Sequence, residues 1–96
     1  MLHLIFQSPL QTATLQRIGN GDAVLFLENA LFYLLQNTTL NADLQTLSGR
    51  TQLCVLDSDL ETRGIAAEEL STGINVINYA GWVSLTTEHK TIQSWF

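Results

Sequence analysis

Short apolar runs alternate with segments of helical spacing along this 96-residue chain. Continuous apolar runs of four or five residues are typical of strands that are covered on both faces. We predict four strands, at residues 2–6, 23–27, 52–56 and 74–77, of which 23–27 is continuously apolar and the others are mainly apolar. Helices are expected between and after them, at residues 10–18, 30–35, 40–47 and 79–89. A further helix is expected to open at residues 57–58, and residues 91–96 are interpreted as a tail.

Capping and turn residues indicate where these helices begin and end. The Ser8–Pro9 pair predicts the start of the first helix, because serine caps helices and proline costs no hydrogen bond at the first helical position. Ser58 and Glu61 have the three-residue spacing of a capping box, and Gly64 fits the end of that helix. Asn78 is expected to cap the last helix.

The alternation of strands and helices predicts the fold class. At this spacing it favours a parallel sheet with right-handed crossovers and helices on both faces. A chain of 96 residues has room for one domain. We therefore predict a single α/β domain over residues 1–96, with three α/β/α layers and a mostly parallel sheet of about four to five strands. Such a small sheet leaves an edge or an apolar helix face available to a neighbour.

Composition indicates a domain that shares part of its surface with a partner. Hydrophobic residues make up 46% of the chain and charged residues 14%, against about 25% charged in typical proteins. Few charges and much apolar content are common where part of the exterior is covered in an oligomer. The net charge of −5 argues against direct binding to a nucleic-acid backbone.

Cysteine usage and the absence of targeting features predict the compartment. A single cysteine excludes an internal disulfide, which fits a reducing compartment. Residues 1–10 lack the basic start and the cleavage site of a signal peptide. No apolar stretch reaches the length of about 20 residues that spans a bilayer. We therefore expect a cytoplasmic protein without membrane contact.

Cys54 is the only soft nucleophile, and two interpretations of it stay open. A persulfide or redox thiol needs a lowered pKa and access to solvent. Cys54 instead lies between Leu53 and Val55 in a predicted strand, which favours a small buried side chain. The two histidines, His3 and His89, do not have the spacing of a zinc site, and a structural role is favoured over catalysis for each.

Acidic and glycine-containing segments are weak candidates for chemistry. Asp57, Asp59 and Glu61 follow the third predicted strand, at the end of the sheet where α/β proteins keep their active sites. Their place at the start of a helix favours a capping role over metal or acid–base chemistry. The glycines within residues 19–21 precede a strand, whereas a phosphate-binding loop follows one. We therefore expect no cofactor and no metal.

Large aromatic side chains gather toward the end of the chain, at Trp82, Trp95 and Phe96. Terminal residues fray unless something holds them, and aromatic residues are enriched in the centres of protein interfaces. Packing within the chain and packing against a partner both stay open for these residues.

Several segments, taken in order along the chain, resemble the TusB/DsrH family of the DsrE/DsrF/DsrH group of sulfur-relay proteins. The matching positions are Leu2, His3, Ser8 and Pro9 at the start, the segment at residues 21–30, then Asp59, Leu60, Arg63 and Gly64, and finally Tyr79, Val83, Leu85, Thr86, His89 and Trp95. Asn78 stands where the family commonly has aspartate, and Trp82 where it commonly has phenylalanine. Some members carry a cysteine in the first helix, but residues 10–18 contain none, so this chain is not expected to carry sulfur in that way.

The resemblance implies a role as one subunit of a larger complex. Members of the family assemble with TusC-like and TusD-like subunits in a heterohexamer. That complex relays persulfide sulfur toward a TusE-like protein, for 2-thiolation of the wobble uridine of tRNA. The transferring cysteine belongs to the TusD-like subunit, so the resemblance implies a non-catalytic structural subunit here.

Three alternatives to that role stay open. The chain could be a DsrH-type subunit in dissimilatory sulfur oxidation, a persulfide carrier that uses Cys54, or a ligand-binding module of flavodoxin-like architecture that works alone. The family pattern and the aromatic ending together name five candidates for a partner interface: His3, Trp82, His89, Trp95 and Phe96.

Overall fold

A five-stranded sheet forms the centre of the protein. The computed structural model describes residues 1–36 and 38–96. The strands are β1 (Leu2–Ile5), β2 (Ala23–Phe26), β3 (Gln52–Leu56), β4 (Ile74–Ile77) and β5 (Ile92–Trp95). They lie in the order β4-β3-β2-β1-β5, and each neighbouring pair is parallel. The predicted α/β fold with a mostly parallel sheet of four to five strands is therefore confirmed.

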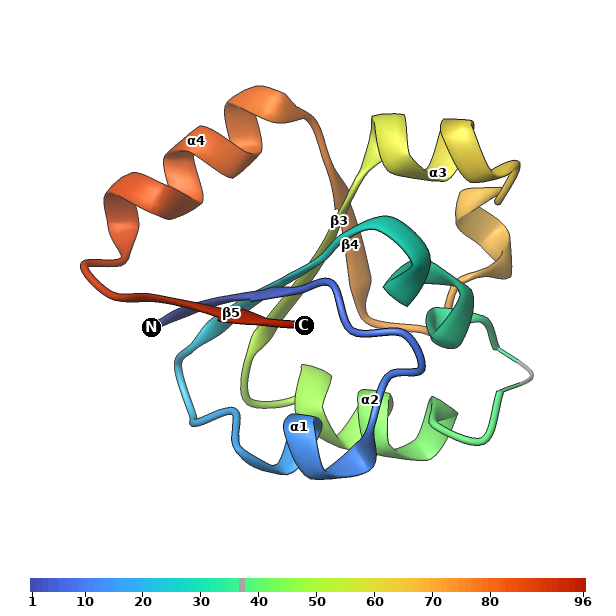
Figure 1. The fold of residues 1–96 in the computed structure, drawn as a ribbon, viewed down its shortest axis with the longest axis horizontal. Helices are drawn as coiled ribbons and strands as arrows, with labels where there is room; N and C mark the ends of the chain where they lie inside the picture. The colour runs from blue at the N-terminus through green and yellow to red at the C-terminus, as the bar shows by residue number, and fades with distance from the viewer. Residues whose placement is uncertain (37) are drawn as a thin grey trace.

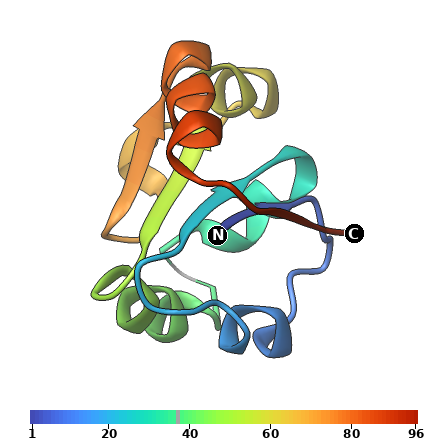
Figure 2. The same cartoon turned by 90° about the vertical axis from the view of Figure 1, so that its left-hand side faces the viewer.

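Helices cover both faces of this sheet, as predicted. They are α1 (Thr12–Gln16), α2 (Asn41–Ser48), α3 (Asp57–Arg63) and α4 (Tyr79–Glu88), with two 3₁₀ helices, η1 (Glu28–Leu34) and η2 (Ala67–Glu69). Figure 1 shows α1 and α2 together on one side of the sheet and α4 on the other. The chain steps from β1 to β4 in one direction, and α4 then carries it back across the other face, so that β5 adds beside β1 (Figure 2).

Two apolar clusters lie on opposite faces of the sheet. Because side chains alternate along a strand, Phe26 and Val55 join the cluster under α1, α2 and η1. Leu25 and Cys54 join the other cluster, together with Leu85, the one buried residue of α4. One face is thus covered by several elements, whereas the other is covered by a single helix of 10 residues.

The start of the first helix differs from the prediction. Helix α1 begins at Thr12, with Gln11 as its N-cap, so the Ser8–Pro9 pair lies outside it. The side chain of Gln7 explains the later start: its Oε1 accepts hydrogen bonds from the Gln11 backbone N–H at 3.1 Å and from Thr14 Oγ1 at 2.8 Å. These bonds hold the chain ahead of the helix in a turn, which leaves a helix of only 5 residues.

Two further details of the helices were predicted wrongly. The buried helix expected at residues 30–35 is the 3₁₀ helix η1, whose tighter winding cannot be separated from an α-helix in so short a run. The capping box of Ser58 and Glu61 is absent because α3 begins at Asp57, whose Oδ1 accepts from the Ser58 backbone N–H at 2.7 Å.

The other two helix signals are confirmed. Gly64 ends α3 in the left-handed region, with φ 67°, where glycine carries no steric penalty. Asn78 caps α4, because its Oδ1 accepts from the Gly81 backbone N–H at 2.9 Å.

The predicted tail is the fifth strand. Strand β5 pairs in parallel with β1, and the backbone N–H of Phe6 donates to the carbonyl oxygen of Trp95 at 2.9 Å beyond the end of the ladder. Its partner lies at the opposite end of the sequence, so no local pattern could reveal the pairing. Within the described part of the chain, no helix is long and apolar enough to cross a membrane.

Candidate interaction surface

The helix α4 and the strand β5 present apolar side chains to solvent. Tyr79 is 71% exposed, Val83 46% and Ile92 47%. Ile92 pairs with Leu2, whose side chain belongs to the cluster beneath α4, so it faces the same side as that helix. No residue of α4 before Glu88 is charged. A cluster of exposed apolar side chains on one face of a protein commonly marks an interaction site.

A groove runs between α4 and strand β1 on this side. It has a volume of about 230 Å³ and is lined by Leu4, Tyr79, Trp82, Val83 and Thr86. The rings of Tyr79 and Trp82 meet edge to face, 6.0 Å apart, which fixes one wall of the groove. The indole Nε1 of Trp82 is buried and has no hydrogen-bond partner among the described residues.

Phe96 extends this side beyond the end of β5. Its ring stacks on Phe6 with centroids 5.1 Å apart, and Phe6 packs against the cluster beneath α4. The ring is nevertheless 85% exposed. We call the whole set the α4 surface, and it consists of Leu4, Tyr79, Trp82, Val83, Ile92 and Phe96.

His3 lies inside the chain, on the other face of the sheet. It is 2% exposed, and its Nε2 is 2.8 Å from Oδ2 of Asp22. Its other ring nitrogen, Nδ1, accepts a hydrogen bond from Nε1 of Trp95 at 3.1 Å. His3 was named as a candidate for a partner interface. Its imidazole joins β1, β5 and the turn before β2, so it can support a partner surface only indirectly.

Asp22 is the charged end of this network, and it was not among the predicted residues. Desolvation raises the pKa of this carboxyl group, but hydrogen bonds from His3, the Gly19 backbone N–H and the Met1 ammonium group outweigh it and lower the pKa to about 2. The Gly19 bond is 3.0 Å long. Asp22 therefore stays a carboxylate, which can only accept hydrogen bonds.

For Trp95, packing within the chain and packing against a partner were both left open. In the structure this side chain packs mainly within the chain. Its ring is partly exposed, packs against the cluster under α1 and α2, and stacks with His3 at a centroid distance of 6.2 Å. The guanidinium of Arg17 lies 6.0 Å from the ring centroid on another side. Trp82 and Phe96 combine internal packing with an exposed apolar surface. His89 is the partly exposed C-cap of α4, at one end of the α4 surface.

Cys54 is placed in the middle of the sheet. It is fully buried in β3, and burial raises the pKa of its thiol to about 11. A thiolate is the reactive form of cysteine. The side chain is therefore an inert part of the core in this structure.

The acidic residues after β3 are engaged in local contacts. Asp59 Oδ1 forms an ion pair with Arg63 at 3.2 Å, and its Oδ2 accepts from the Glu28 backbone N–H at 3.3 Å. Among the described residues, no group of three or more potential ligands could hold a metal ion.

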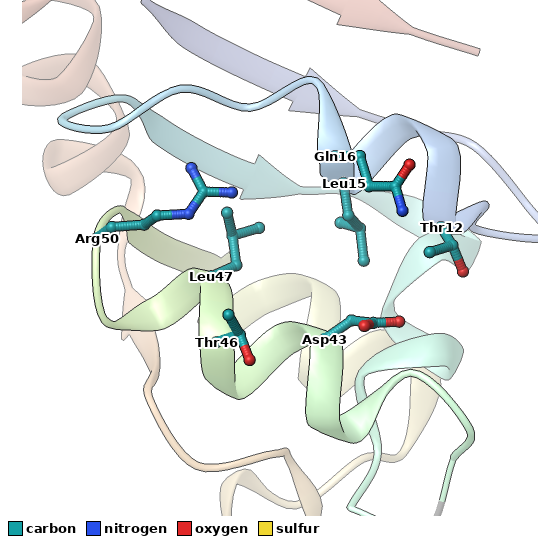
Figure 3. Close-up of a pocket in the computed structure, with 7 residues that line it drawn as sticks. All are labelled: Thr12, Leu15, Gln16, Asp43, Thr46, Leu47 and Arg50. Atoms are coloured by element: carbon teal, nitrogen blue, oxygen red, sulfur yellow. The ribbon is translucent and has the colours of Figure 1, made fainter.

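A smaller cavity of about 130 Å³ lies between α1 and α2 (Figure 3). It is lined by Thr12, Leu15, Gln16, Asp43, Thr46, Leu47 and Arg50. Arg50, its only cationic side chain, already donates to the Ile18 carbonyl oxygen at 2.7 Å.

Sequence patterns pointed to only part of this surface. The apolar character of α4 is visible in residues 79–83, but it does not tell which side faces the sheet. Leu4 and Ile92 come from strands whose pairing is non-local. No sequence signal identified Asp22, because His3 becomes its neighbour only when β1 and β2 pair.

Comparisons with known proteins give a consistent result. The family model described as "DsrH like protein" matches residues 6–92. Protein TusB of Buchnera aphidicola subsp. Baizongia pistaciae is 34% identical over 99 residues, covering 99% of this chain and 100% of that protein. Protein TusB of Cronobacter sakazakii is 31% identical over 98 residues, with 99% and 100% coverage. The crystal structure of the ychN protein from E. coli superposes with a TM-score of 0.77 at 10% identity, covering 98% of this chain and 97% of that one.

Proposed function

This chain belongs to the family of DsrH-like proteins, and we propose that it is a non-catalytic structural subunit of a TusBCD-like sulfur-relay complex. The observation that carries the proposal is the match to proteins named TusB over essentially their full length. In this proposal the complex supports 2-thiolation of the wobble uridine of tRNA. The partners are TusC-like and TusD-like subunits in a heterohexamer, and sulfur leaves the complex toward a TusE-like protein.

The state of the thiol supports a non-catalytic role. A sulfur carrier must form a persulfide on an accessible thiolate and then release it to the next thiol. Cys54 is fully buried, and burial raises the pKa of its thiol to about 11. The residue that carries sulfur therefore belongs, in this proposal, to a partner subunit. The net charge of −5 likewise favours indirect contact with tRNA through the relay.

The α4 surface is the proposed contact with the partner subunits. It combines an apolar groove, a helix that carries no charge before Glu88 and the exposed ring of Phe96. Trp82, Phe96 and His89 contact the partner in this proposal. Trp95 and His3 hold the strand β5 in place from the opposite face of the sheet. Aromatic anchors set in an apolar groove commonly supply most of the binding energy of an interface.

Substitution of one exposed residue tests the surface. Val83→Asp places a charge in the groove without touching the core, since Val83 is 46% exposed. Phe32→Asp is the matched control, because Phe32 is 44% exposed but lies on η1, which packs on the opposite face. Native mass spectrometry of complexes isolated from the protein's own cells gives the readout. We expect two other small subunits to be recovered with the parent chain and with Phe32→Asp, and at least about tenfold less with Val83→Asp.

The same experiment has outcomes that contradict the proposal. Recovery of the parent chain alone would remove the subunit role itself. Equal recovery with both variants would keep the subunit role but place the interface elsewhere.

A cysteine substitution tests the non-catalytic assignment. Cys54→Ser changes one atom at a buried site, and Cys54→Ala controls for the buried hydroxyl. We expect thiolated tRNA at the parental level in cells that carry either variant. Loss of thiolation with both variants, at unchanged amounts of assembled complex, would instead support the persulfide carrier.

A role in dissimilatory sulfur oxidation is the second candidate, because the matching family model is described by the DsrH name. The relatives named TusB favour thiolation. Deletion of the gene separates the two: loss of 2-thiouridine in tRNA supports the first role, and loss of sulfur oxidation with intact tRNA supports the second.

A further inference from the structure

The strand β5 is held to the sheet from one side only. It is an edge strand of 4 residues whose single neighbour is β1. The described side-chain network adds one hydrogen bond across the sheet, from Trp95 Nε1 to His3 Nδ1 at 3.1 Å, between residues 92 positions apart. Any change that removes this bond acts on a strand that has ladder hydrogen bonds on one side only.

The partners of His3 determine where its proton lies. The indole Nε1 of Trp95 can only donate, so His3 Nδ1 must accept and carries no proton. Asp22 is a carboxylate and can only accept, so His3 Nε2 must donate at 2.8 Å. Both bonds can form together only in the neutral imidazole that carries its proton on Nε2.

A second proton on His3 affects its two bonds differently. The proton has to go to Nδ1, where it faces the N–H of Trp95, and two donors cannot share a hydrogen bond. The bond to Asp22 survives and becomes an ion pair, which keeps the imidazolium in place. Protonation therefore removes the link to β5 and leaves the link to the turn before β2 intact.

We propose that His3 is a proton-sensitive clamp, which holds Trp95 and the strand β5 when neutral and releases them when protonated. The inference concerns contacts within this chain and does not depend on the function proposed above. In the released state the edge of β1 loses its partner strand and becomes accessible, and Ile92, already 47% exposed, leaves its place in the α4 surface. Acidification would thus alter this edge of the sheet without unfolding the domain.

Few other charges surround the clamp. Asp22 comes from the turn before β2, and the ammonium group of Met1 lies 3.2 Å from its Oδ1. Arg17, the C-cap of α1, faces the ring of Trp95. The residues that pair with His3 on the neighbouring strands, Val24 and Gln93, are uncharged. Among the residues that the structure describes, Asp22 is therefore the only anion in direct contact with the imidazole.

Nuclear magnetic resonance tests the clamp on the full chain labelled with ¹⁵N. The imidazole ¹⁵N shifts of His3 report its tautomer, and the indole N–H of Trp95 reports the hydrogen bond. The pH is lowered from about 8 to about 4, a range in which Asp22 stays charged, and replacement of the Nε2–H tautomer by the imidazolium marks the protonation of His3. Over the same pH range, hydrogen exchange of the Trp95 indole and the β5 amides, corrected for its intrinsic pH dependence, should become about tenfold faster relative to the β3 amides.

Two variants and one internal control sharpen the test. In His3→Asn the side chain cannot titrate, so the relative protection of β5 should no longer depend on pH. In Trp95→Phe the ring remains but the donor is lost, so β5 should stay less protected at every pH while His3 still titrates. His89, at the partly exposed end of α4, reports an imidazole outside the network.

Three results would overturn the proposal. The first is an Nδ1–H tautomer of His3 near neutral pH. The second is protonation of His3 with no change in the relative exchange of the Trp95 indole. The third is a His3 that stays neutral until the whole domain unfolds. Each can be read from the parent chain alone, so the proposal stays testable if a variant fails to fold.

Discussion

Replacement of Asp22 by asparagine tests the energetic weight of the network around His3. The carboxylate accepts from His3 Nε2 at 2.8 Å and from the Gly19 N–H at 3.0 Å, and its side chain is 19% exposed. Its pKa is lowered from the ordinary value of 3.8 to about 2. A difference of nearly two units corresponds to about 2 kcal/mol of stability supplied by the charged form. Asp22→Asn removes the charge at nearly constant size, so we expect it to destabilise the fold by about this amount at neutral pH.

The pH dependence separates this effect from a loss of packing. Because the pKa of Asp22 is lower in the folded chain, its contribution is fully present above about pH 4 and is lost as the pH falls through about 2. The free energies of unfolding of the parent chain and of Asp22→Asn, measured in urea, should therefore differ by an amount that narrows over that range. Glu61→Gln, at an exposed position of α3, is the control and should change stability by less than about 0.5 kcal/mol. A gap for Asp22→Asn that does not vary with pH would refute the reasoning.

Three further predictions concern the core and one turn. Cys54 is fully buried with a raised pKa, so its alkylation under native conditions should be limited by unfolding, and labelling as fast as that of a model thiol would contradict this. Leu85→Ala removes the one buried side chain of α4 and should lower the free energy of unfolding in urea by about 2–5 kcal/mol. The loss of protection against hydrogen exchange should be concentrated in α4, and a uniform loss over the domain would contradict the idea that α4 alone detaches. Gly64→Ala forces a side chain into φ 67° and should lower stability by about 1 kcal/mol, whereas no change would show that α3 can end differently.

The elements with strong local patterns were predicted from the sequence. Strands β3 and β4 begin and end at the predicted residues, because each is a short, mainly apolar run followed at once by the start of a helix. The cap at Asn78 and the stop at Gly64 were also correct, since each depends on one residue and its neighbours along the chain. These local signals were sufficient to predict a parallel α/β sheet.

The features that were missed depend on contacts between distant parts of the chain. Strand β5 is short and largely exposed, and only its pairing with β1 makes it a strand. The bond between His3 and Trp95 joins residues 92 positions apart, and no periodicity relates them. For the same reason the sequence did not reveal that His3 is buried between β2 and β5.

The two faces of the sheet differ in a way that bears on partner binding. The face under α1, α2 and η1 buries its apolar residues within the chain. The opposite face is covered by α4, which contributes one buried residue and leaves Tyr79 and Val83 in solvent. Helices that stand alone in water present polar residues outward, yet α4 has no charged side chain before Glu88. Stability of this chain alone does not explain a charge-free outer surface on α4. A second protein that covers α4 would explain this lack of charge. The outer surface of α4 is therefore the strongest structural reason to expect that the domain works as part of an assembly.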